Sequence, residues 1–376
     1  MARFLYFSRD YSTHDHRFLT ALEKTGHKIY YLRLESRGHA LEDRPIPPTV
    51  EQVQWVGGDR PVRLKDGLRL FLDLKKVLKK INPDLVHAGP IQTAALLVAL
   101  TGYRPLVSMS WGYDLLVDAQ KSSSWAWATR YALKHSSVMI GDCQTIRQTA
   151  VLYGMPQDRI VTFPWGVDLQ HFSPGNEVQQ DPAQEIHARL GWGKDTFILL
   201  STRSWELIYG VDILAEAFVL AARRHPELRL LMLGNGSLSA RLHQIFTRGE
   251  VADFVVYPGQ VKQAELPKYY RAADLFVSAS HSDGTSISML EALACGCPVL
   301  LSDIPGNMEW IRPGEQGWLF HDGNALDLAE KMVKAIENQK LLAGMRREAR
   351  CLAEKRADWN KNSQELLSAY RLAGLN

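Results

Sequence analysis

Short apolar runs alternate with helical patterns in two blocks of this sequence, and the alternation limits the choice of fold more than any other feature. In the first block, apolar runs at residues 4–7, 27–32 and 85–87 are each followed by a helical pattern. A second block of the same kind begins with the apolar run at residues 197–201. Strands that alternate with helices form parallel sheets with helices on both faces. We therefore predict an α/β fold with two parallel-sheet domains and a cleft between them.

The length of the chain agrees with two domains, because 376 residues are too many for one ordinary hydrophobic core. Between residues 167 and 194 the alternation lapses, and Gly, Pro, Asp, Gln and Asn become frequent. Such a composition is typical of an interdomain link. We predict a first domain at residues 1–166, the link at 167–194, a second domain at 195–355 and a terminal helix at 356–376.

The composition is that of an ordinary globular protein and argues against several classes. The net charge of +3 is too small to indicate a nucleic-acid partner, and no basic stripe with interleaved aromatic residues occurs. No apolar run approaches the length of a membrane span, and residues 1–8 are too short for a signal peptide, so a cytoplasmic location is the default expectation. Cys295-x-Cys297 does not have a usual zinc spacing, so we expect reduced, partly buried thiols and no metal.

The stretch from residue 282 to residue 311 carries the strongest functional pattern. A small-residue turn, Gly284-Thr285-Ser286, follows Asp283 and precedes a helical run that contains Glu291. Free backbone N–H groups at such a helix start, together with the helix dipole, favour an anion. Glu291 lies beyond this turn by roughly 9 Å along a helix axis. A phosphate at the helix start would leave an attached sugar within reach of Glu291, which indicates binding of a nucleotide-linked group.

This stretch resembles the family 4 glycosyltransferases, whose mark is an acidic pair spaced E-x7-E and followed by A-x-G-x-P. Here Asp283 takes the first acidic position and Glu291 the second. The resemblance implies the GT-B architecture, two facing Rossmann-like domains whose last helix returns to the first domain. It also implies that Glu291 binds the donor ribose, that Asp283 lies near the donor sugar, and that the diphosphate meets the backbone of Gly284, Thr285 and Ser286. An amphipathic helix with a solvated Glu and a loop Asp is the alternative.

A cation follows the strand predicted at residues 197–201. Arg203 would face the diphosphate there and stabilise the leaving nucleotide as negative charge develops. The family has an Arg at this place and, a few residues later, a Lys before Gly, but Tyr209 stands at the Lys position before Gly210. A phenol donates a hydrogen bond without adding charge at neutral pH. The alternative for Arg203 is a solvated charge at a strand end.

Two glycine turns of the second block resemble further segments of the family. Gly234-Asn235 follows the strand predicted at residues 228–233 and resembles the V-G-x-G segment, where the backbone approaches the donor. Gln260-Val261 matches the loop that receives the nucleotide base. Ordinary strand-to-helix turns also favour Gly, so simple turn geometry is the alternative. Residues 304–307 likewise fit a turn.

The first block departs further from the family pattern. The family has a Gly-Gly loop after its first strand, whereas this chain has no Gly there, and His14 is a candidate for contact with the sugar or the acceptor. Trp111 stands where the family commonly has His, and it offers stacking area and one N–H donor but no proton transfer. Asp114 is a candidate catalytic residue near the acceptor or the donor sugar. His87 ends a predicted strand as a further candidate, and packed or surface roles are the alternative for both histidines.

The helix predicted at residues 65–80 is basic and amphipathic. Arg69 and four lysines oppose an apolar face of Leu, Phe, Val and Ile residues. Such a helix can lie on anionic lipid, so peripheral contact with the inner membrane face is one hypothesis. A core-packed helix with a solvated cationic face is the other.

The resemblance implies a retaining glycosyltransferase that transfers a hexose from a UDP- or GDP-sugar to an acceptor hydroxyl, in polysaccharide or glycolipid synthesis. We expect a saccharide or lipid-linked acceptor, and neither a metal nor a cofactor, since the nucleotide sugar is a co-substrate. Three altered polar positions, Asp283, Tyr209 and Trp111, leave a catalytically idle nucleotide-sugar binder as an alternative. A GT-B nucleotide-sugar epimerase or hydrolase is a further alternative.

Overall fold

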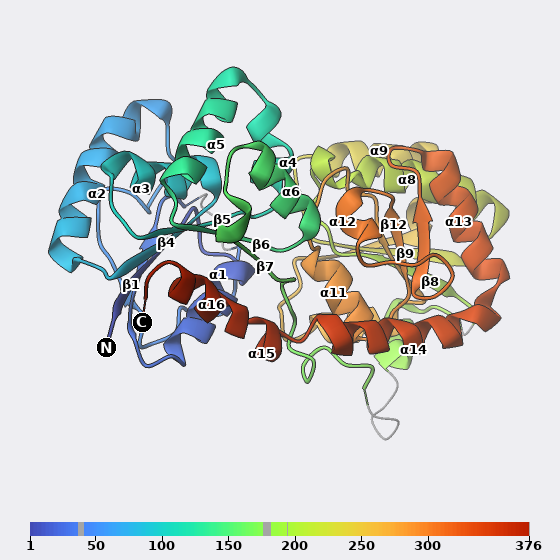
Figure 1. Ribbon diagram of the computed structural model, residues 1–376. Coiled ribbons are helices and arrows are strands. Elements are labelled where there is room, and N and C mark those ends of the chain that lie inside the picture. The colour runs from blue at the N-terminus through green and yellow to red at the C-terminus, as the bar shows by residue number, and fades with distance from the viewer. Residues whose placement is uncertain (37–40, 176–181, 194, 376) are drawn as a thin grey trace. The chain divides into compact units, whose positions relative to one another are not determined.

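The computed structural model describes residues 1–36, 41–175, 182–193 and 195–375 (Figure 1). The chain divides into two compact units. The first unit holds Met1–Pro164 and the C-terminal residues from Asn362 onward, and the second unit holds Trp165–Lys361. The described part of the predicted link belongs to the second unit, where Arg189 of helix α7 donates a hydrogen bond to the Tyr269 hydroxyl at 2.9 Å.

The first unit is built on a parallel sheet. In the described part of the chain, this sheet has seven strands in the order β3-β2-β1-β4-β5-β6-β7. The strands are β1 (Arg3–Ser8), β2 (Lys28–Arg33), β3 (Glu51–Gln52), β4 (Leu85–Gly89), β5 (Leu106–Met109), β6 (Val138–Gly141) and β7 (Ile160–Thr162). The predicted alternation of strands and helices is confirmed for this block.

Helices cover both faces of this first sheet. They are α1 (Thr13–Glu23), α2 (Gly67–Ile81), α3 (Leu96–Thr101), α4 (Tyr113–Leu116), α5 (Ser123–His135), α6 (Gln144–Leu152) and α16 (Gln364–Leu372). Leu5 of β1 packs in a cluster with residues of α2 and α3. On the other face, Phe4 contacts Tyr370 of α16 and Tyr6 contacts Phe18 of α1. Figure 1 shows α2 and α3 on one side of the sheet and α1 and α16 on the other.

Local differences from the sequence-based prediction have physical reasons. β3 consists of two exposed polar residues, so no apolar run in the sequence predicts it. The segment predicted as one helix at residues 91–100 forms a π-helical turn, Ile91–Ala95, followed by α3. The turn predicted at residues 304–307 is present, because the Asn307 N–H donates to the Ile304 carbonyl at 3.0 Å. It continues into the one-turn helix α12 (Pro305–Met308), which Pro305 begins at a position where its missing N–H costs nothing.

The second unit repeats the plan of the first. In the described part of the chain, its sheet has six parallel strands in the order β10-β9-β8-β11-β12-β13. The strands are β8 (Phe197–Ser201), β9 (Leu228–Leu233), β10 (Val255–Gly259), β11 (Leu275–Ser278), β12 (Val299–Ser302) and β13 (Gly317–Phe320). The helices are α7 (Pro182–Leu190), α8 (Val211–Arg224), α9 (Ser239–Arg248), α10 (Leu266–Ala272), α11 (Ile287–Ala294), α12, α13 (Ala325–Glu337), α14 (Gln339–Arg356) and α15 (Trp359–Asn362).

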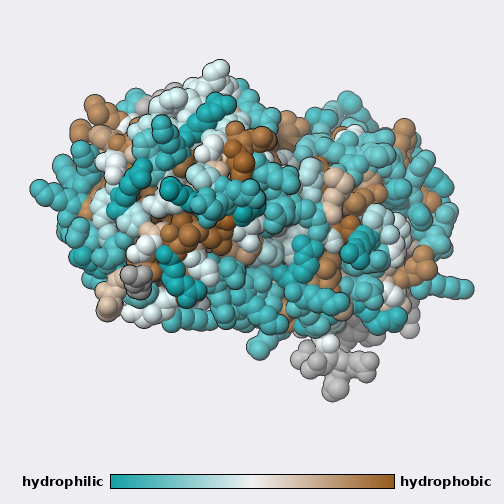
Figure 2. All heavy atoms as spheres, viewed as in Figure 1, coloured by the Kyte–Doolittle hydropathy of each residue, from teal (hydrophilic) through white to brown (hydrophobic). Residues whose placement is uncertain are grey.

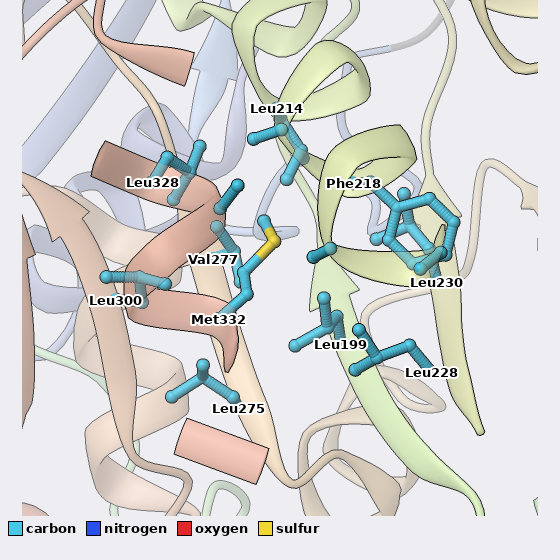
Figure 3. Packing of buried hydrophobic residues seen from close by; sticks show 14 of the residues in the cluster. Leu199, Leu214, Phe218, Leu228, Leu230, Leu275, Val277, Leu300, Leu328 and Met332 are labelled. Atoms are coloured by element: carbon cyan, nitrogen blue, oxygen red, sulfur yellow. The ribbon is translucent and has the colours of Figure 1, made fainter. Parts of the chain in front are cut away.

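Two apolar layers sandwich the second sheet. Figure 3 shows one of them, in which Leu199, Leu230 and Val277 of the strands meet Phe218 of α8 and Met332 of α13. All five side chains are fully buried. Burying one such side chain contributes about 1.5–3 kcal/mol to stability. The opposite layer is formed with α10, α11 and α14, and it holds α11 rigidly against the sheet.

The strand order of each sheet reverses at one place. In the first unit the reversal lies between β1 and β4, and in the second unit between β8 and β11. Ligands of open α/β sheets bind outside the carboxyl ends of the strands at such a point. In the second unit, the loops that follow β8 and β11 therefore meet where a ligand is expected.

The face of the molecule that Figure 2 draws is predominantly polar. On the face drawn in Figure 2, apolar residues form only small patches among hydrophilic ones. None of the helices among the described residues combines the length and apolar composition needed to cross a membrane.

Candidate functional site

The loops after β8 and β11 are brought together by pairing of the two strands and by a glycine. Leu199 of β8 pairs with Leu275 of β11. Gly210, which precedes α8, has φ +56°, and a Cβ there would overlap the carbonyl oxygen of Ala279. This close approach requires glycine. It fixes the start of α8 against the end of β11.

Arg203 is the centre of the polar contacts in these loops. Its Nη2 donates to Asp283 Oδ2 at 2.7 Å, and its Nη1 donates to the hydroxyls of Ser286 and Ser288 at 2.9 and 3.1 Å. The guanidinium carbon lies 4.1 Å from the centroid of the Tyr209 ring. Within the described residues, the buried Arg203 Nε has no hydrogen-bond partner. The structure therefore brings together four predicted site residues from two loops that are far apart in the sequence.

Tyr209 meets Arg203 through its ring face. The sequence pattern placed Tyr209 where the family has Lys and assigned it a hydrogen bond from its hydroxyl. The 4.1 Å separation is a cation–π contact, and the hydrogen bond from the hydroxyl to the diphosphate stays a prediction. Ser288 was missed by the sequence analysis, because one more Ser in the first turn of a helix carries no signal of its own.

The predicted diphosphate loop lies directly before α11. Ser286 is the N-cap of this helix, and its hydroxyl accepts a hydrogen bond from the Met289 N–H at 3.5 Å. Gly284 and Thr285 lie in the loop rather than in the first helical turn. A Cβ on Gly306 would come within 2.5 Å of the carbonyl oxygens of Asp283 and Gly284. Helix α12 therefore packs closely against the backbone of this loop.

Glu291 is buried within α11 and bonds to side chains of other segments. Its side chain is 4% exposed, and it accepts hydrogen bonds from the Tyr270 hydroxyl at 2.8 Å and from Gln263 Nε2 at 3.2 Å. The Tyr270 hydroxyl is also 3.1 Å from Thr202 Oγ1. Burial, followed by the charge of Glu291, raises the pKa of Tyr270 well above its usual value, so the phenol stays protonated and donates. The Tyr270 hydroxyl therefore connects Glu291 to Thr202, the residue that precedes Arg203.

Sequence reasoning missed Tyr270 and Gln263. Tyr270 follows Tyr269 in the sequence, and only the helical position of Tyr270 in α10 turns its hydroxyl toward Glu291. No local pattern separates the two tyrosines. Gln263 lies three residues beyond the predicted base-contact residue Gln260, in the same loop.

The loops after β9 and β10 join the same edge of the sheet. Gly234 has φ +94° and donates from its N–H to the Gly259 carbonyl at 2.8 Å. The Asn235 carbonyl accepts from the Trp205 N–H at 3.0 Å. Val261 packs, half-buried, against the apolar layer that includes α11, and Gln260 is exposed. These four predicted residues therefore lie in loops adjacent to those of Arg203.

In the first unit, the candidate Asp114 is surrounded by hydrogen-bond donors of the same unit. The side chain is completely buried, and Oδ1 accepts from the Ser110 hydroxyl at 2.6 Å and from the Trp111 and Leu115 N–H groups at 3.0 Å. Oδ2 accepts from the Ile91 N–H at 2.9 Å. These bonds hold the Trp111 loop in place, and the catalytic role of Asp114 stays a prediction.

The remaining candidates of the first unit fall into two environments. The rings of His14 and Trp111 lie 5.4 Å apart, so these two sugar or acceptor candidates are neighbours. His87 is buried in the core and its Nδ1 is 2.7 Å from the Tyr370 hydroxyl. Burial lowers the pKa of His87 to about 3. This environment favours the packed role that the sequence left open for His87.

Side chains that commonly bind metals do not form a cluster among the described residues. No group of three or more His, Cys, Asp or Glu side chains there is placed to hold a metal ion. The side chains of Cys143, Cys295 and Cys297 are buried, and that of Cys351 is half-buried.

Two family profiles match most of the chain. The profile described as "Glycosyltransferase Family 4" matches residues 12–171. The profile described as "Glycosyl transferases group 1" matches residues 182–352, which include Arg203, Asp283 and Glu291.

Curated relatives are similar over part of their length. The chain is 30% identical over 237 residues to a D-inositol 3-phosphate glycosyltransferase of Thermomonospora curvata, covering 60% of this chain and 54% of that protein. It is 26% identical over 253 residues to the mannosylfructose-phosphate synthase of Agrobacterium fabrum, covering 63% of this chain and 54% of that protein. The chain thus spans about half the length of the curated relatives it matches.

Solved structures match over nearly the whole chain. Anabaena Alr3699/HepE in complex with UDP-glucose has a TM-score of 0.81 at 20% identity, covering 99% of this chain and 100% of that one. Sucrose-phosphate synthase from Thermosynechococcus elongatus has a TM-score of 0.82 at 16% identity, covering 99% and 98%. Identities this low show the fold alone, which is the GT-B fold with its two Rossmann-like units. With both family profiles matching in order along the sequence, this chain belongs to the family 4 glycosyltransferases.

Proposed function

We propose that this chain is a retaining glycosyltransferase that transfers a hexose from a UDP- or GDP-sugar to an acceptor hydroxyl. The observation that carries the proposal is the convergence of Arg203, Asp283 and the N-terminal residues of α11 at the strand-order reversal of the second sheet. The buried carboxylate of Glu291 lies further along the same helix. A cation, a helix start and a buried carboxylate are the groups that a nucleotide diphosphate sugar requires.

Arg203 and α11 would stabilise the leaving nucleotide. As the bond between the sugar C1 and the phosphate oxygen breaks, its electron pair passes to the diphosphate. A fixed guanidinium, serine hydroxyls and helix-start amides stabilise the negative charge that develops there. These groups supply the charge stabilisation in the proposal, which includes no metal and no cofactor.

The donor and the acceptor have separate roles in this mechanism. Glu291 would accept hydrogen bonds from the ribose hydroxyls, and Asp283 would lie near the donor sugar. The acceptor oxygen forms its bond to C1 on the face that the phosphate leaves, and the acceptor proton passes to the departing phosphate oxygen. This route needs no general base, so Trp111 in place of a His does not prevent it.

The names of similar proteins support a sugar-nucleotide donor. They differ in the acceptor, so they indicate only its general class. One structural neighbour, Anabaena Alr3699/HepE, is known in complex with UDP and glucose. The similar curated proteins are named for inositol 3-phosphate and mannosylfructose phosphate. We propose a saccharide or lipid-linked acceptor, in polysaccharide or glycolipid synthesis.

A donor screen tests the proposal. UDP- and GDP-hexoses are compared by thermal shift, and products are analysed with the best donor and a panel of acceptors. We expect Glu291→Ala to abolish donor binding and Arg203→Ala to lower turnover strongly. Intact affinity in Glu291→Ala would refute the ribose assignment. Donor binding without nucleotide release indicates an idle binder, and donor turnover without acceptor indicates an epimerase or hydrolase.

We also propose that the first unit contacts an anionic membrane surface through α2. One face of α2 is packed in the core, as one of the two hypotheses expects, but Leu68 and Leu72 on the other face are 71% and 51% exposed. The same helix exposes five cations: Arg69, Lys75, Lys76, Lys79 and Lys80. Helix α3 packs against both α2 and α5, and α5 exposes 54% of Trp127. Leucines and a tryptophan among lysines are typical of an interfacial surface.

Vesicle sedimentation tests this surface. Phosphatidylcholine vesicles with about a third phosphatidylglycerol should bind the protein, and pure phosphatidylcholine vesicles should not. Lys76→Gln with Lys79→Gln should weaken binding about 30-fold, because each lysine near such a surface contributes about 1 kcal/mol. The matched control is Lys334→Gln with Lys340→Gln, which removes the same charge from the second unit. An equal loss of vesicle binding in the two double variants would refute binding through α2.

A further inference from the structure

The cation assigned to the donor diphosphate is already bound by an anion of the chain itself. Arg203 and Asp283 are 2.7 Å apart, and their side chains are only 12% and 20% exposed. The other terminal nitrogen of Arg203 donates to Ser286 and Ser288. Short bonds between charged groups that are partly shielded from water are strong. The positive charge of Arg203 is therefore neutralised before a ligand arrives.

Tyr209 holds the same guanidinium from a different direction. Its ring face lies under the guanidinium at 4.1 Å. Tyr209 ends the 3-10 turn Leu207–Tyr209, and the next residue is Gly210, which abuts Ala279. The ring is thus anchored by the backbone at the start of α8. A ring face attracts the cation whether it binds a carboxylate or a phosphate, whereas Asp283 competes with the phosphate.

We propose that Asp283 is an internal competitor of the donor diphosphate for Arg203, and that the ring of Tyr209 holds the guanidinium in place while the anions exchange. The inference rests on the proposed function for the identity of the incoming anion. The exchange breaks no covalent bond. Arg203 N–H groups pass from the Asp283 carboxylate to phosphate oxygens, and Arg203 Nε, which has no partner among the described residues, is a further donor for them. The released carboxylate is then free to face the donor sugar.

Isothermal titration with UDP and with inorganic pyrophosphate tests the competition. Asp283→Asn keeps the shape of the side chain and removes its charge, so both ligands should bind about tenfold more tightly than to the wild type. Turnover with the nucleotide sugar should fall in the same variant, because the carboxylate near the sugar is lost. Asp322→Asn is the control, since Asp322 pairs with His281 close by in the sequence and does not contact Arg203. Its affinities should equal those of the wild type.

Two substitutions of Tyr209 test the ring. Tyr209→Phe keeps the ring and should bind UDP like the wild type, whereas Tyr209→Leu should bind about fivefold more weakly. Equal weakening by Phe and Leu would show that the hydroxyl acts instead and would overturn the positioning role. Circular dichroism of each variant confirms that the fold is retained.

The outcomes separate this inference from the proposed function. Unchanged or weaker binding of UDP and pyrophosphate by Asp283→Asn overturns the competition, even if the wild type is an active transferase. A wild type that binds neither UDP nor GDP contradicts the proposed function. In that case, tighter pyrophosphate binding by Asp283→Asn would still uphold the ion-pair competition.

Discussion

The Tyr370 hydroxyl lies 2.7 Å from Nδ1 of His87, and this hydrogen bond ties the C-terminal helix α16 to strand β4 of the first sheet. Both side chains are 1% exposed. The rings also meet edge to face, with centroids 5.7 Å apart. Because burial lowers the pKa of His87 to about 3, the ring is neutral at physiological pH and bonds without charge.

Loss of this hydrogen bond should destabilise the first unit. Tyr370→Phe keeps the ring and leaves His87 Nδ1 without its partner, which costs about 1–3 kcal/mol. Urea unfolding followed by tryptophan fluorescence measures the change. Tyr257→Phe, in the second unit, should change stability by less than about 0.5 kcal/mol. An unchanged urea midpoint in Tyr370→Phe would contradict the structural role of the bond.

Two buried groups of the first unit should have opposite effects on stability as pH changes. Burial raises the pKa of Asp15 from 3.8 to about 7, so its contribution to stability is present below pH 3.8 and is lost as pH rises through 7. His87 has a lowered pKa, so its contribution is present above pH 6.5 and is lost as pH falls toward 3. Between about pH 4 and 6.5 the two slopes cancel, each being about 1.4 kcal/mol per pH unit.

Single substitutions should reveal these slopes. Relative to the wild type, the unfolding free energy of Asp15→Asn should rise with pH between 4 and 6.5. That of His87→Gln should fall over the same range. The pKa values of the neighbouring phenols of Tyr6 and Tyr370 are raised well above 10, so they do not titrate there. Denaturant titrations at several pH values provide the test, and parallel curves for all three proteins would refute it.

A methyl group at Gly306 should disturb the candidate diphosphate loop. Its Cβ would press on the carbonyl oxygens of Asp283 and Gly284 at 2.5 Å, and backbone atoms cannot yield cheaply. We expect Gly306→Ala to cost about 1–3 kcal/mol and to weaken nucleotide binding. Gly344→Ala is the control, because nothing lies within 4 Å of its Cβ in α14. That change should stabilise the protein by about 0.5–1 kcal/mol, since Ala favours a helix.

The hydroxyl of Tyr270 should contribute to donor affinity, whereas the hydroxyl of its neighbour Tyr269 should not. Tyr270→Phe removes the hydroxyl that donates to Glu291 at 2.8 Å and frees the carboxylate to rotate. Donor affinity should fall about tenfold, which corresponds to roughly 1.4 kcal/mol. Tyr269→Phe removes only the bond to Arg189 and should retain the affinity. Calorimetric titration with the best donor compares them, and equal affinities would exclude Tyr270 from positioning Glu291.

Local patterns were sufficient for most of the strands and helices and for their order. The apolar runs at β8 and β11 and the glycines between strands and helices are spaced over a few residues, so they can be recognised without knowledge of distant contacts. The same holds for the segment from Asp283 to Glu291, whose spacing follows from one loop and one helix. The short strand β3 was not predicted, because it forms at the edge of the sheet by pairing with β2 and has no apolar pattern.

The sequence by itself determined two Rossmann-like sheets and the family, because both depend on periodicity and on residue types at close spacing. Only the tertiary structure decided which charges meet. Arg203 and Asp283 are 80 residues apart and become partners through the pairing of β8 with β11. Asp114 is enclosed by amides from two loops, and Glu291 is oriented by a tyrosine from another helix. Such contacts depend on how distant segments pack, and no local pattern of amino acids specifies them.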